Sequence, residues 1–345
     1  QGNTPKSIQA YLQALSIDPD YETAYIALQY APVDPAQLEE LITAYRQIAK
    51  SSPETHLVWG NLGDALMLAG KKVQAITAYQ TGCKKHTLKK RPELSQFTWK
   101  DKKELGPDYI IIGAGKCGTS SLHKYIGEHP NVLLPHKKEL NFFNSNLTRG
   151  LDWYLAQFPA ITDRSEFITG ESSPGYFHLP NIDQKIYSHF PKNKLIVLLR
   201  NPIDRAISWY YHNVKRGLEN RTLETVIEIE RSRLKNMKER DYATAGGHLA
   251  EGLYVYKLKR WMSTFPKEQF LILKSENFYG QTAVTMEKVF NFLELPTYIS
   301  KHYQKYNVGS YKSVDENLRS SLRDIFQPHN EKLSHYVGRD FSWHD

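Results

Sequence analysis

The pattern of apolar positions changes its period near residue 107. Before that point the pattern Ile-x-Ala-Tyr begins at Ile8, Ile42 and Ile76, each 34 residues after the one before. Other pairs keep the same interval, namely Pro19 and Pro53, Tyr25 and Trp59, and Leu28 and Leu62. A period of this length predicts helix-turn-helix units stacked in an array, because one unit buries its apolar face only against the next.

Short apolar runs replace this period after residue 107. Tyr109–Gly113 and Leu195–Leu199 are each typical of a buried strand. The segment "SSLHKYIGEHP" after the first run predicts an amphipathic helix that ends at Pro130, and a second helix is expected to begin near Ile203. The second part of the chain therefore contains strands that lead through turns into helices.

The turn after the first strand is a glycine loop, "GAGKCGTSSL", at Gly113–Leu122. A Walker phosphate loop has its lysine directly after the last glycine, whereas Lys116 here precedes Gly118. Three hydroxyl side chains follow, at Thr119, Ser120 and Ser121. A strand, a glycine loop and a helix N-terminus in this order predict an anion site, because free amides and the helix dipole point at the ligand.

A second anion-binding element follows the second strand. That strand ends in Arg200, and Ser208 lies eight residues further on, where a helix can bring it back over the strand end. A guanidinium with a hydroxyl suits a second phosphate group. An enzyme that uses magnesium ATP would be expected to carry an aspartate at such a strand end. The pair therefore favours a nucleotide with two separate phosphate sites.

With these motifs in place, residues Pro107–Asp345 resemble the PAPS-dependent sulfotransferases, most closely the heparan sulfate N- and 3-O-sulfotransferase branch. "PDYIIIGAGKCGTSSL" is similar to the family's 5′-phosphosulfate loop, and "RNPIDRAISWYY" to its 3′-phosphate motif with Asn201 in place of aspartate. The resemblance implies PAPS as the sulfuryl donor and PAP as the product. It implies these nucleotide-binding residues: Gly115, Lys116, Cys117, Gly118, Thr119, Ser120, Ser121, Arg200, Ser208, and a late loop of Gly309, Ser310, Tyr311 and Lys312.

The same resemblance suggests two catalytic residues. "HKKELNFFN" is similar to the family's E-x-x-F-F segment and places a general base at Glu139, while Lys116 would neutralise the leaving nucleotide. Two departures bear on acceptor recognition. Asn141 and Asn144 differ from the 3-O-sulfotransferases, and Ser172 stands where the family has an active-site lysine.

The expected fold is an all-α solenoid followed by an α/β, P-loop-like sulfotransferase domain with a central parallel sheet. The first part resembles the tetratricopeptide repeat (TPR) family, and "WGNLGDAL" followed by "AITAY" strengthens the match. The expected divisions are TPR repeats at 1–92 with a truncated first repeat, a charged linker at 93–106, and the sulfotransferase domain at 107–345. Gly2 aligns with Gly70, so we expect further repeats before the first residue. The array is either a scaffold for a protein partner or a packing module.

Composition narrows the setting. The net charge of +8 and pI near 9.1 suit anionic partners, of which an acidic glycan fits the resemblance best and nucleic acid is not expected. No apolar run approaches the ~20 residues of a membrane span. The two cysteines, Cys83 and Cys117, favour a reducing compartment, so a cytoplasmic enzyme of bacterial style is expected, with the Golgi lumen as the alternative. The histidines His123, His136, His178, His212 and His248 have no metal-ligand spacing, and no metal is expected.

These observations favour transfer of a sulfuryl group from PAPS to a hydroxyl or amine of a glycan. Sulfation of a small-molecule or lipid hydroxyl is the first alternative. A P-loop kinase and a non-catalytic TPR scaffold are the others. A requirement for magnesium would favour the kinase, and an inactive Glu139→Gln variant that keeps every function would favour the scaffold.

Overall fold

The computed structural model describes residues 4–29, 31, 33–99, 106–161, 166–300, 303 and 314–343. The chain forms two compact units. The first comprises Gln1–Gly106, Leu133–Lys138 and Asn146–Thr169, and the second comprises Pro107–Val132, Glu139–Ser145 and Gly170–Asp345. The sequence predicts two continuous domains, at 1–92 and 107–345, joined by a linker. In the structure two segments after residue 132, Leu133–Lys138 and Asn146–Thr169, belong to the first unit, and we call them the exchanged segments. The continuous domain boundaries stay a prediction.

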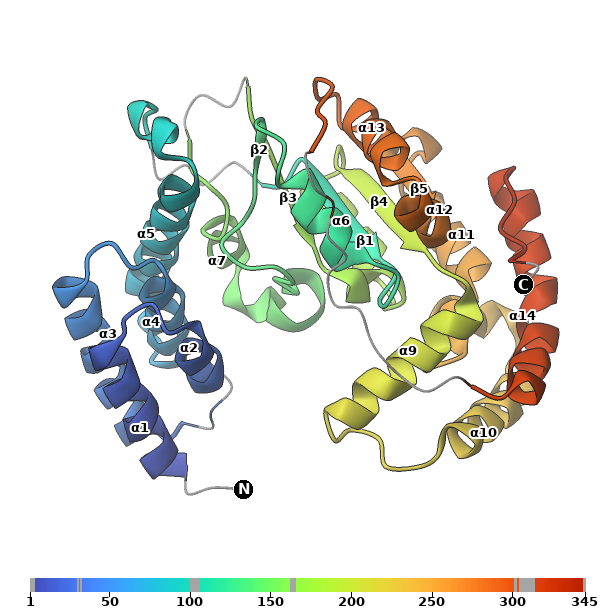
Figure 1. Ribbon diagram of the computed structural model, residues 1–345, viewed down its shortest axis with the longest axis horizontal. Helices are drawn as coiled ribbons and strands as arrows, with labels where there is room; N and C mark the ends of the chain where they lie inside the picture. The colour runs from blue at the N-terminus through green and yellow to red at the C-terminus, as the bar shows by residue number, and fades with distance from the viewer. Residues whose placement is uncertain are drawn as a thin grey trace. The chain divides into compact units, whose positions relative to one another are not determined.

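The first unit begins with five helices (Figure 1). They are α1 Thr4–Ile17, α2 Glu22–Gln29, α3 Pro35–Ser51, α4 Leu57–Leu68 and α5 Lys72–Lys90. Each helix packs on the next one along the chain from α3 to α5 and from α1 to α2, and α1 also contacts α3 while α2 contacts α4. Helices that carry equivalent positions of the 34-residue period, α1 with α3 and α2 with α4, are therefore in contact.

Small residues opposite aromatic residues let these helices approach. A Cβ atom on Gly63 would lie 2.6 Å from the Tyr79 ring, and one on Gly82 would lie 2.8 Å from Cβ of Trp59. Tyr79 itself is buried. At the start of α3, Asp34 and Gln37 form a capping box that satisfies amides of the first turn. The helical pairs are thus specified by close packing and by local capping.

The two later segments of the first unit add a small core to this array. Leu133 and Phe167 pack with Leu94 and Ile161, and Trp99 forms an antiparallel bridge with Ile161. A short helix, α7 Leu151–Leu155, lies in the second of these segments. The first unit is therefore built from residues on both sides of the predicted domain boundary.

A five-stranded sheet organises the second part of the chain. Its strands are β1 Tyr109–Gly113, β2 Val132–Leu133, β3 Ile168–Ser172, β4 Lys194–Leu199 and β5 Phe270–Lys274, in the order β2-β3-β1-β4-β5. β1 pairs in parallel with β3 and β4, and β4 pairs in parallel with β5. Both predicted strands are confirmed, and the parallel arrangement brings their carboxyl ends to one edge.

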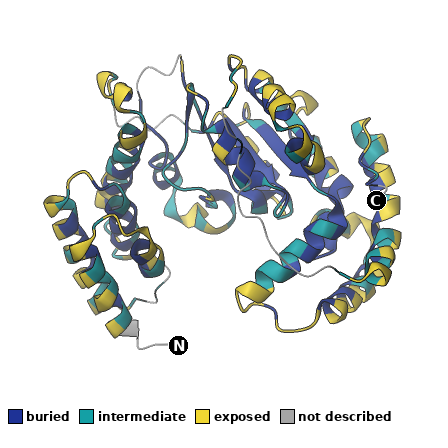
Figure 2. Ribbon diagram, viewed as in Figure 1, coloured by how far each residue is buried: buried dark blue, intermediate teal, exposed yellow. Residues whose placement is uncertain are grey.

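The second unit also contains helices that connect the strands or follow the last of them. They are α6 Thr119–Ile126, α8 Ile182–His189, α9 Pro202–Lys215, α10 Leu223–Asn236, α11 Tyr254–Thr264, α12 Ser275–Gly280, α13 Thr282–Phe292 and α14 Glu316–Val337. α6 packs on β1 and α13, and α12 and α13 pack on β5. Figure 2 shows the strands buried and the outer faces of α10 and α14 exposed. The predicted helix after the glycine loop ends at Ile126, before Pro130, because Gly127 closes its last turn.

Among the residues that the structure describes, no helix is both long and apolar enough to cross a membrane.

Candidate active site

The glycine loop joins β1 to α6 in an unusual backbone conformation. Lys116 has φ 69° and Gly118 has φ 98°, both in the left-handed region. Gly118 is the N-cap of α6 and no side chain caps the helix there. A Cβ on Gly118 would lie 2.7 Å from the Tyr279 hydroxyl, so only glycine fits. The first-turn amides of α6 are therefore arranged as in an anion site.

The side chains of the loop divide into two groups. Cys117 is buried, its Sγ lies 3.8 Å from the Tyr254 hydroxyl, and burial raises the pKa of its thiol to about 11. Ser121 is buried and its Oγ lies 3.3 Å from the Tyr279 hydroxyl. Thr119 is also buried. Gly115, Lys116, Gly118 and Ser120 are partly exposed. The second group is the one that a ligand reaches without rearrangement.

Arg200 lies beside this loop at the end of β4. Its Nη1 donates a long hydrogen bond of 3.5 Å to the carbonyl oxygen of Lys116. Its own carbonyl accepts a hydrogen bond of 2.9 Å from the Tyr254 hydroxyl, which fixes the strand end. Burial and the charge of Arg200 lower the pKa of Lys116. Lys116 and Arg200, which were predicted from separate motifs, therefore lie next to each other.

Asn201 takes over a structural role in the turn after Arg200. Its side-chain oxygen accepts a hydrogen bond of 2.9 Å from the amide of Ile203, which caps α9. The backbone amide of Asn201 donates a hydrogen bond of 2.8 Å to the Glu276 carboxylate. Asparagine and aspartate both cap helices well, so the departure from the family motif preserves this turn.

Ser208 lies near the middle of α9 and is partly exposed. His212 follows one helical turn later, so the two side chains share a face. Burial and the charge of Lys116 lower the pKa of His212, while the Glu139 carboxylate opposes that shift. This face of α9 is therefore within electrostatic reach of both predicted catalytic residues. From the sequence, His212 was noted only as lacking metal-ligand spacing. Its spacing of four from Ser208 is the signal that points to this face of α9.

Glu139 sits in a tight turn after the first exchanged segment. It has φ 60° and Asn141 has φ 49°, which for residues other than glycine stores strain. The amide of Glu139 donates to the carbonyl of Ser172 at 3.1 Å, and the Asn141 side chain donates to the carbonyl of Glu139 at 3.0 Å. The Glu139 carboxylate raises the pKa of Lys116 against the effect of burial. The structure therefore brings Glu139, Lys116 and Arg200 into one electrostatic neighbourhood.

A buried carboxylate is connected to this turn by hydrogen bonds. Glu171 in β3 accepts hydrogen bonds from the hydroxyls of Ser173, at 2.7 Å, and Tyr176, at 3.1 Å. Ser173 Oγ in turn accepts from the amide of Asn141 at 3.1 Å. Glu171 is fully buried, so its charge is held by these donors. The motif "ESSPGYF" thus acts on the Glu139 turn through Ser173.

Ser172, where the family has lysine, is fully buried, and its Oγ has no hydrogen-bond partner among the described residues. Phe142 and Phe143 are buried, and the ring of Phe143 lies 5.8 Å from that of Tyr176. Glu139 is exposed, at the edge of this aromatic core. The predicted late loop, Gly309, Ser310, Tyr311 and Lys312, lies outside the described residues.

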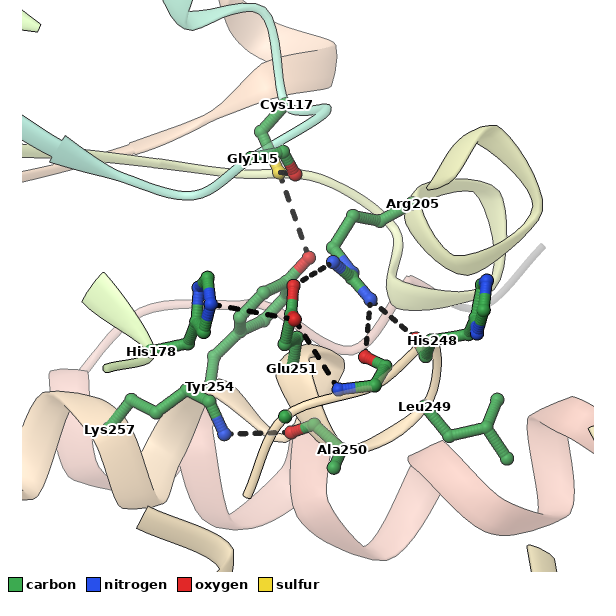
Figure 3. Close-up of polar contacts among 12 residues, drawn as sticks. Gly115, Cys117, His178, Arg205, His248, Leu249, Ala250, Glu251, Tyr254 and Lys257 are labelled. Atoms are coloured by element: carbon green, nitrogen blue, oxygen red, sulfur yellow. Dashed lines mark hydrogen bonds and ion pairs between the residues drawn. The ribbon is translucent and has the colours of Figure 1, made fainter. Parts of the chain in front are cut away.

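The second arginine of the α9 motif, Arg205, points away from the loop (Figure 3). Its Nη1 donates to the Glu251 carboxylate at 2.9 Å, and its Nη2 donates to the carbonyl of His248. His178 Nε2 lies 3.6 Å from the same carboxylate. Arg205 is buried, and this paired charge still contributes to the lowered pKa of Lys116. Arg205 therefore belongs to a buried ion pair behind the site.

Lys257 in the same cluster makes stability depend on pH. Its amine is buried and donates to the carbonyls of Ala250, at 2.7 Å, and Tyr242, at 2.9 Å. Burial lowers its pKa from 10.5 to about 7. Between these values the unfolded chain binds a proton that the folded chain does not, so the free energy of unfolding rises with pH by up to ~1.4 kcal/mol per unit.

We expect the Lys257→Met variant to lose this dependence. Urea unfolding of parent and variant at about pH 7 and pH 9.5 measures it. The parent should gain stability relative to the variant at the higher pH. An unchanged difference between the two proteins would show that the amine stays protonated in the fold.

With this geometry in view, comparison with known proteins gives the family. Residues 106–345 match the model of the sulfotransferase domain, so the chain belongs to the sulfotransferase domain family and is a sulfotransferase enzyme. The crystal structure of a sulfotransferase from Alicyclobacillus acidocaldarius has 29% sequence identity and a TM-score of 0.57, and the match covers 69% of this chain and 98% of that one. The α/β fold with a parallel sheet is thereby confirmed for this part of the chain.

Curated relatives carry the same domain. The membrane-associated sulfotransferase kil1 of Dictyostelium discoideum is 24% identical over 312 residues, covering 69% of this chain and 66% of that protein. The human heparan sulfate glucosamine 3-O-sulfotransferase 5 is 27% identical over 308 residues, covering 82% of this chain and 87% of that protein. The bifunctional heparan sulfate N-deacetylase/N-sulfotransferase 1 of Caenorhabditis elegans is 26% identical over 270 residues, but the chain spans only 30% of its length.

Proposed function

We propose that this enzyme transfers a sulfuryl group from PAPS to a hydroxyl or amine of a glycan. Glu139 acts as the general base and Lys116 stabilises the leaving PAP. The observation that carries this proposal is the convergence of Lys116, Arg200 and Glu139, whose charges act on one another although they lie in three separate motifs.

The residues at the loop fit an adenosine nucleotide with two separated phosphate groups. The first turn of α6 has no side-chain cap, and Gly118 leaves no room for a Cβ atom. These features support binding of the 5′-phosphosulfate at the loop. Arg200, with Ser208 on α9, would hold the 3′-phosphate, because a guanidinium and a hydroxyl provide directed donors. Gly115 and Ser120 are accessible for further contacts, and the residues 309–312 stay part of the proposal from sequence.

PAPS supplies the sulfuryl group as an activated phosphosulfate when it is bound. Glu139 accepts the proton of the acceptor hydroxyl or amine as the new bond to sulfur forms. The sulfur–oxygen bond to the phosphate breaks in the same in-line displacement, and Lys116 neutralises the charge that develops on that oxygen. The proton ends on Glu139 and the leaving pair of electrons on the phosphate of PAP.

A glycan acceptor rests on two observations. Two of the relatives described above are named for heparan sulfate, and the net charge of +8 suits an acidic polymer. Ser172 stands where the family has a lysine, and Asn141 differs from the 3-O-sulfotransferases, so the position sulfated is expected to differ from theirs. A small-molecule or lipid hydroxyl is the alternative that an acceptor screen would detect.

Thermal melts with PAP, ADP and magnesium ATP test the donor site. A ligand at ~100 times its dissociation constant stabilises a protein by roughly 2.7 kcal/mol. We expect PAP to raise the melting temperature of the parent more than ADP does, and the difference to vanish in the Arg200→Ala variant. The matched control is Arg216→Ala at the end of α9.

Two results would contradict the proposed donor. Equal stabilisation by magnesium ATP and PAP would favour the kinase alternative. An undiminished PAP effect in Arg200→Ala would remove Arg200 from the 3′-phosphate site.

We infer that the first five helices are TPR repeats. The 34-residue period, the contacts between equivalent helices and the pairing of small with aromatic residues support this. Such an array is also suited to bind a protein partner, which pull-down with the isolated chain as bait would test.

Both cysteines are free and buried, which supports a reducing, cytoplasmic setting.

A further inference from the structure

We propose that Asp64, in the helical array, is a positioning residue for the catalytic turn. This inference rests on the proposed role of Glu139 as general base. Asp64 lies on α4 of the first unit, 75 residues before Glu139 in the sequence. It acts through the two chain segments that precede and follow the turn.

The Asp64 carboxylate collects three donors. Its Oδ2 accepts from Lys137 Nζ at 2.8 Å, and its Oδ1 accepts from the Tyr79 hydroxyl at 2.6 Å and from Arg149 Nη1 at 3.4 Å. The Asp64 side chain is only 22% exposed, and those of Lys137 and Arg149 are 27% and 30% exposed. These ion pairs are therefore better shielded from solvent than ordinary surface pairs.

The two cations come from opposite sides of one short stretch of chain. Lys137 belongs to Leu133–Lys138 and Arg149 to Asn146–Thr169, which are the two exchanged segments of the first unit. Between them the chain runs through Glu139–Ser145 in the second unit, with Glu139 at its start. One carboxylate of the helical array thus anchors the chain both before and after the segment that carries the proposed base.

Other contacts fix the same two segments. The amide of His136 donates to the carbonyl of Gln157 at 3.1 Å, which joins one segment to the other. Cys83 Sγ on α5 donates to the same carbonyl at 3.3 Å. A Cβ on Gly60 of α4 would lie 2.6 Å from His136 Nε2, so the array leaves no space there. The guanidinium of Arg149 also lies 5.1 Å from the Trp153 ring.

Anchoring matters at this place because the turn is strained. Glu139 and Asn141 both have left-handed φ values, which persist only where the surroundings hold them. A general base must lie within hydrogen-bond reach of the proton it removes, and small displacements cost much of the rate. Asp64 therefore acts on the proposed base through the two chain segments that flank it, without touching the reacting atoms.

The test combines hydrogen exchange with kinetics in three variants of the full chain. Asp64→Ala removes the anchor and Asp64→Glu retains the charge. Glu39→Ala breaks the ion pair with Lys71 (2.7 Å), which lies in the same helical array and includes neither Lys137 nor Arg149. Amide exchange is measured by mass spectrometry on peptides that cover 139–145. Turnover is measured with PAPS and N-desulfated heparan chains, and PAP binding by its effect on the melting temperature.

We expect Asp64→Ala to exchange faster across 139–145 and to lower kcat between ~10- and 100-fold. KM for PAPS and stabilisation by PAP should be unchanged, because the glycine loop and Arg200 belong to the second unit. Asp64→Glu should recover part of kcat, and Glu39→Ala should match the parent in every measurement.

Unchanged exchange in 139–145 in folded Asp64→Ala would overturn the proposal, as would an equal effect of Glu39→Ala. A loss of PAP stabilisation in Asp64→Ala would show general damage instead of positioning and would also overturn it. Failure of the proposed function is separate: full activity of a Glu139→Gln variant would refute the base, while the exchange measurement would still report on the anchor.

Discussion

The Glu139→Gln variant is expected to lose turnover by ~10²–10⁴-fold, the usual contribution of a positioned acid-base group. Glutamine has nearly the size of the glutamate side chain. It also keeps the backbone hydrogen bonds of the turn, including the one from the backbone amide of residue 139 to the carbonyl of Ser172. It cannot take the acceptor's proton. Initial rates of sulfate transfer from PAPS measure the loss, and the melting shift with PAP should stay at the parental value.

The same substitution at Glu287, an exposed carboxylate on α13, is the control and should leave the rate unchanged. A Glu139→Gln enzyme with more than about half of the parental rate would exclude Glu139 as the base. His212 would then be the next residue to replace, because it lies within electrostatic reach of Lys116.

The Lys116→Ala variant is expected to lower kcat by ~10²–10³-fold, as removal of one group that stabilises a developing oxyanion does. The loss arises because the loop amides alone would face the charge on the leaving PAP. Single-turnover rates with PAPS separate this chemical defect from weaker binding. Lys124→Ala, an exposed lysine on α6, is the matched control.

The pH dependence of turnover checks the same residue. The pKa of Lys116 lies below its ordinary value of 10.5, because burial and Arg200 disfavour the ammonium form. Lys116 stabilises the leaving group only while protonated, so the rate should fall on the alkaline side at a pH below 10.5. A Lys116→Arg enzyme stays charged, and its remaining activity should lack this limb. An identical limb in both enzymes would assign it to another group.

Much of the second unit follows from local sequence. The predicted runs Tyr109–Gly113 and Leu195–Leu199 are buried in strands β1 and β4, since an uninterrupted apolar run of this length needs burial on both faces. Lys116 and Arg200 end next to each other because parallel neighbouring strands present their carboxyl ends at one edge. Helix ends were less well predicted, as α6 shows by stopping before Pro130.

Other features depend on contacts between residues distant in sequence. The electrostatic coupling of His212 to Lys116 depends on where α9 lies in the fold, which the spacing of residues in the sequence does not contain. Glu171 supports the Glu139 turn through Ser173, and a single acidic residue in a buried strand gives no sign of its partners in the sequence.

The sequence by itself determined two of the five strands, β1 and β4, and the glycine loop, because each depends on residues a few positions apart. The order of the motifs and the 34-residue period are also read directly from the sequence. Only the tertiary structure decided that the segments on both sides of Glu139–Ser145 belong to the helical unit. The bonds of Asp64 to Lys137 and Arg149 join residues 73 and 85 positions apart. The packing of the whole chain selects these pairs. From the sequence alone, many other lysines and arginines could form an ion pair with Asp64 equally well.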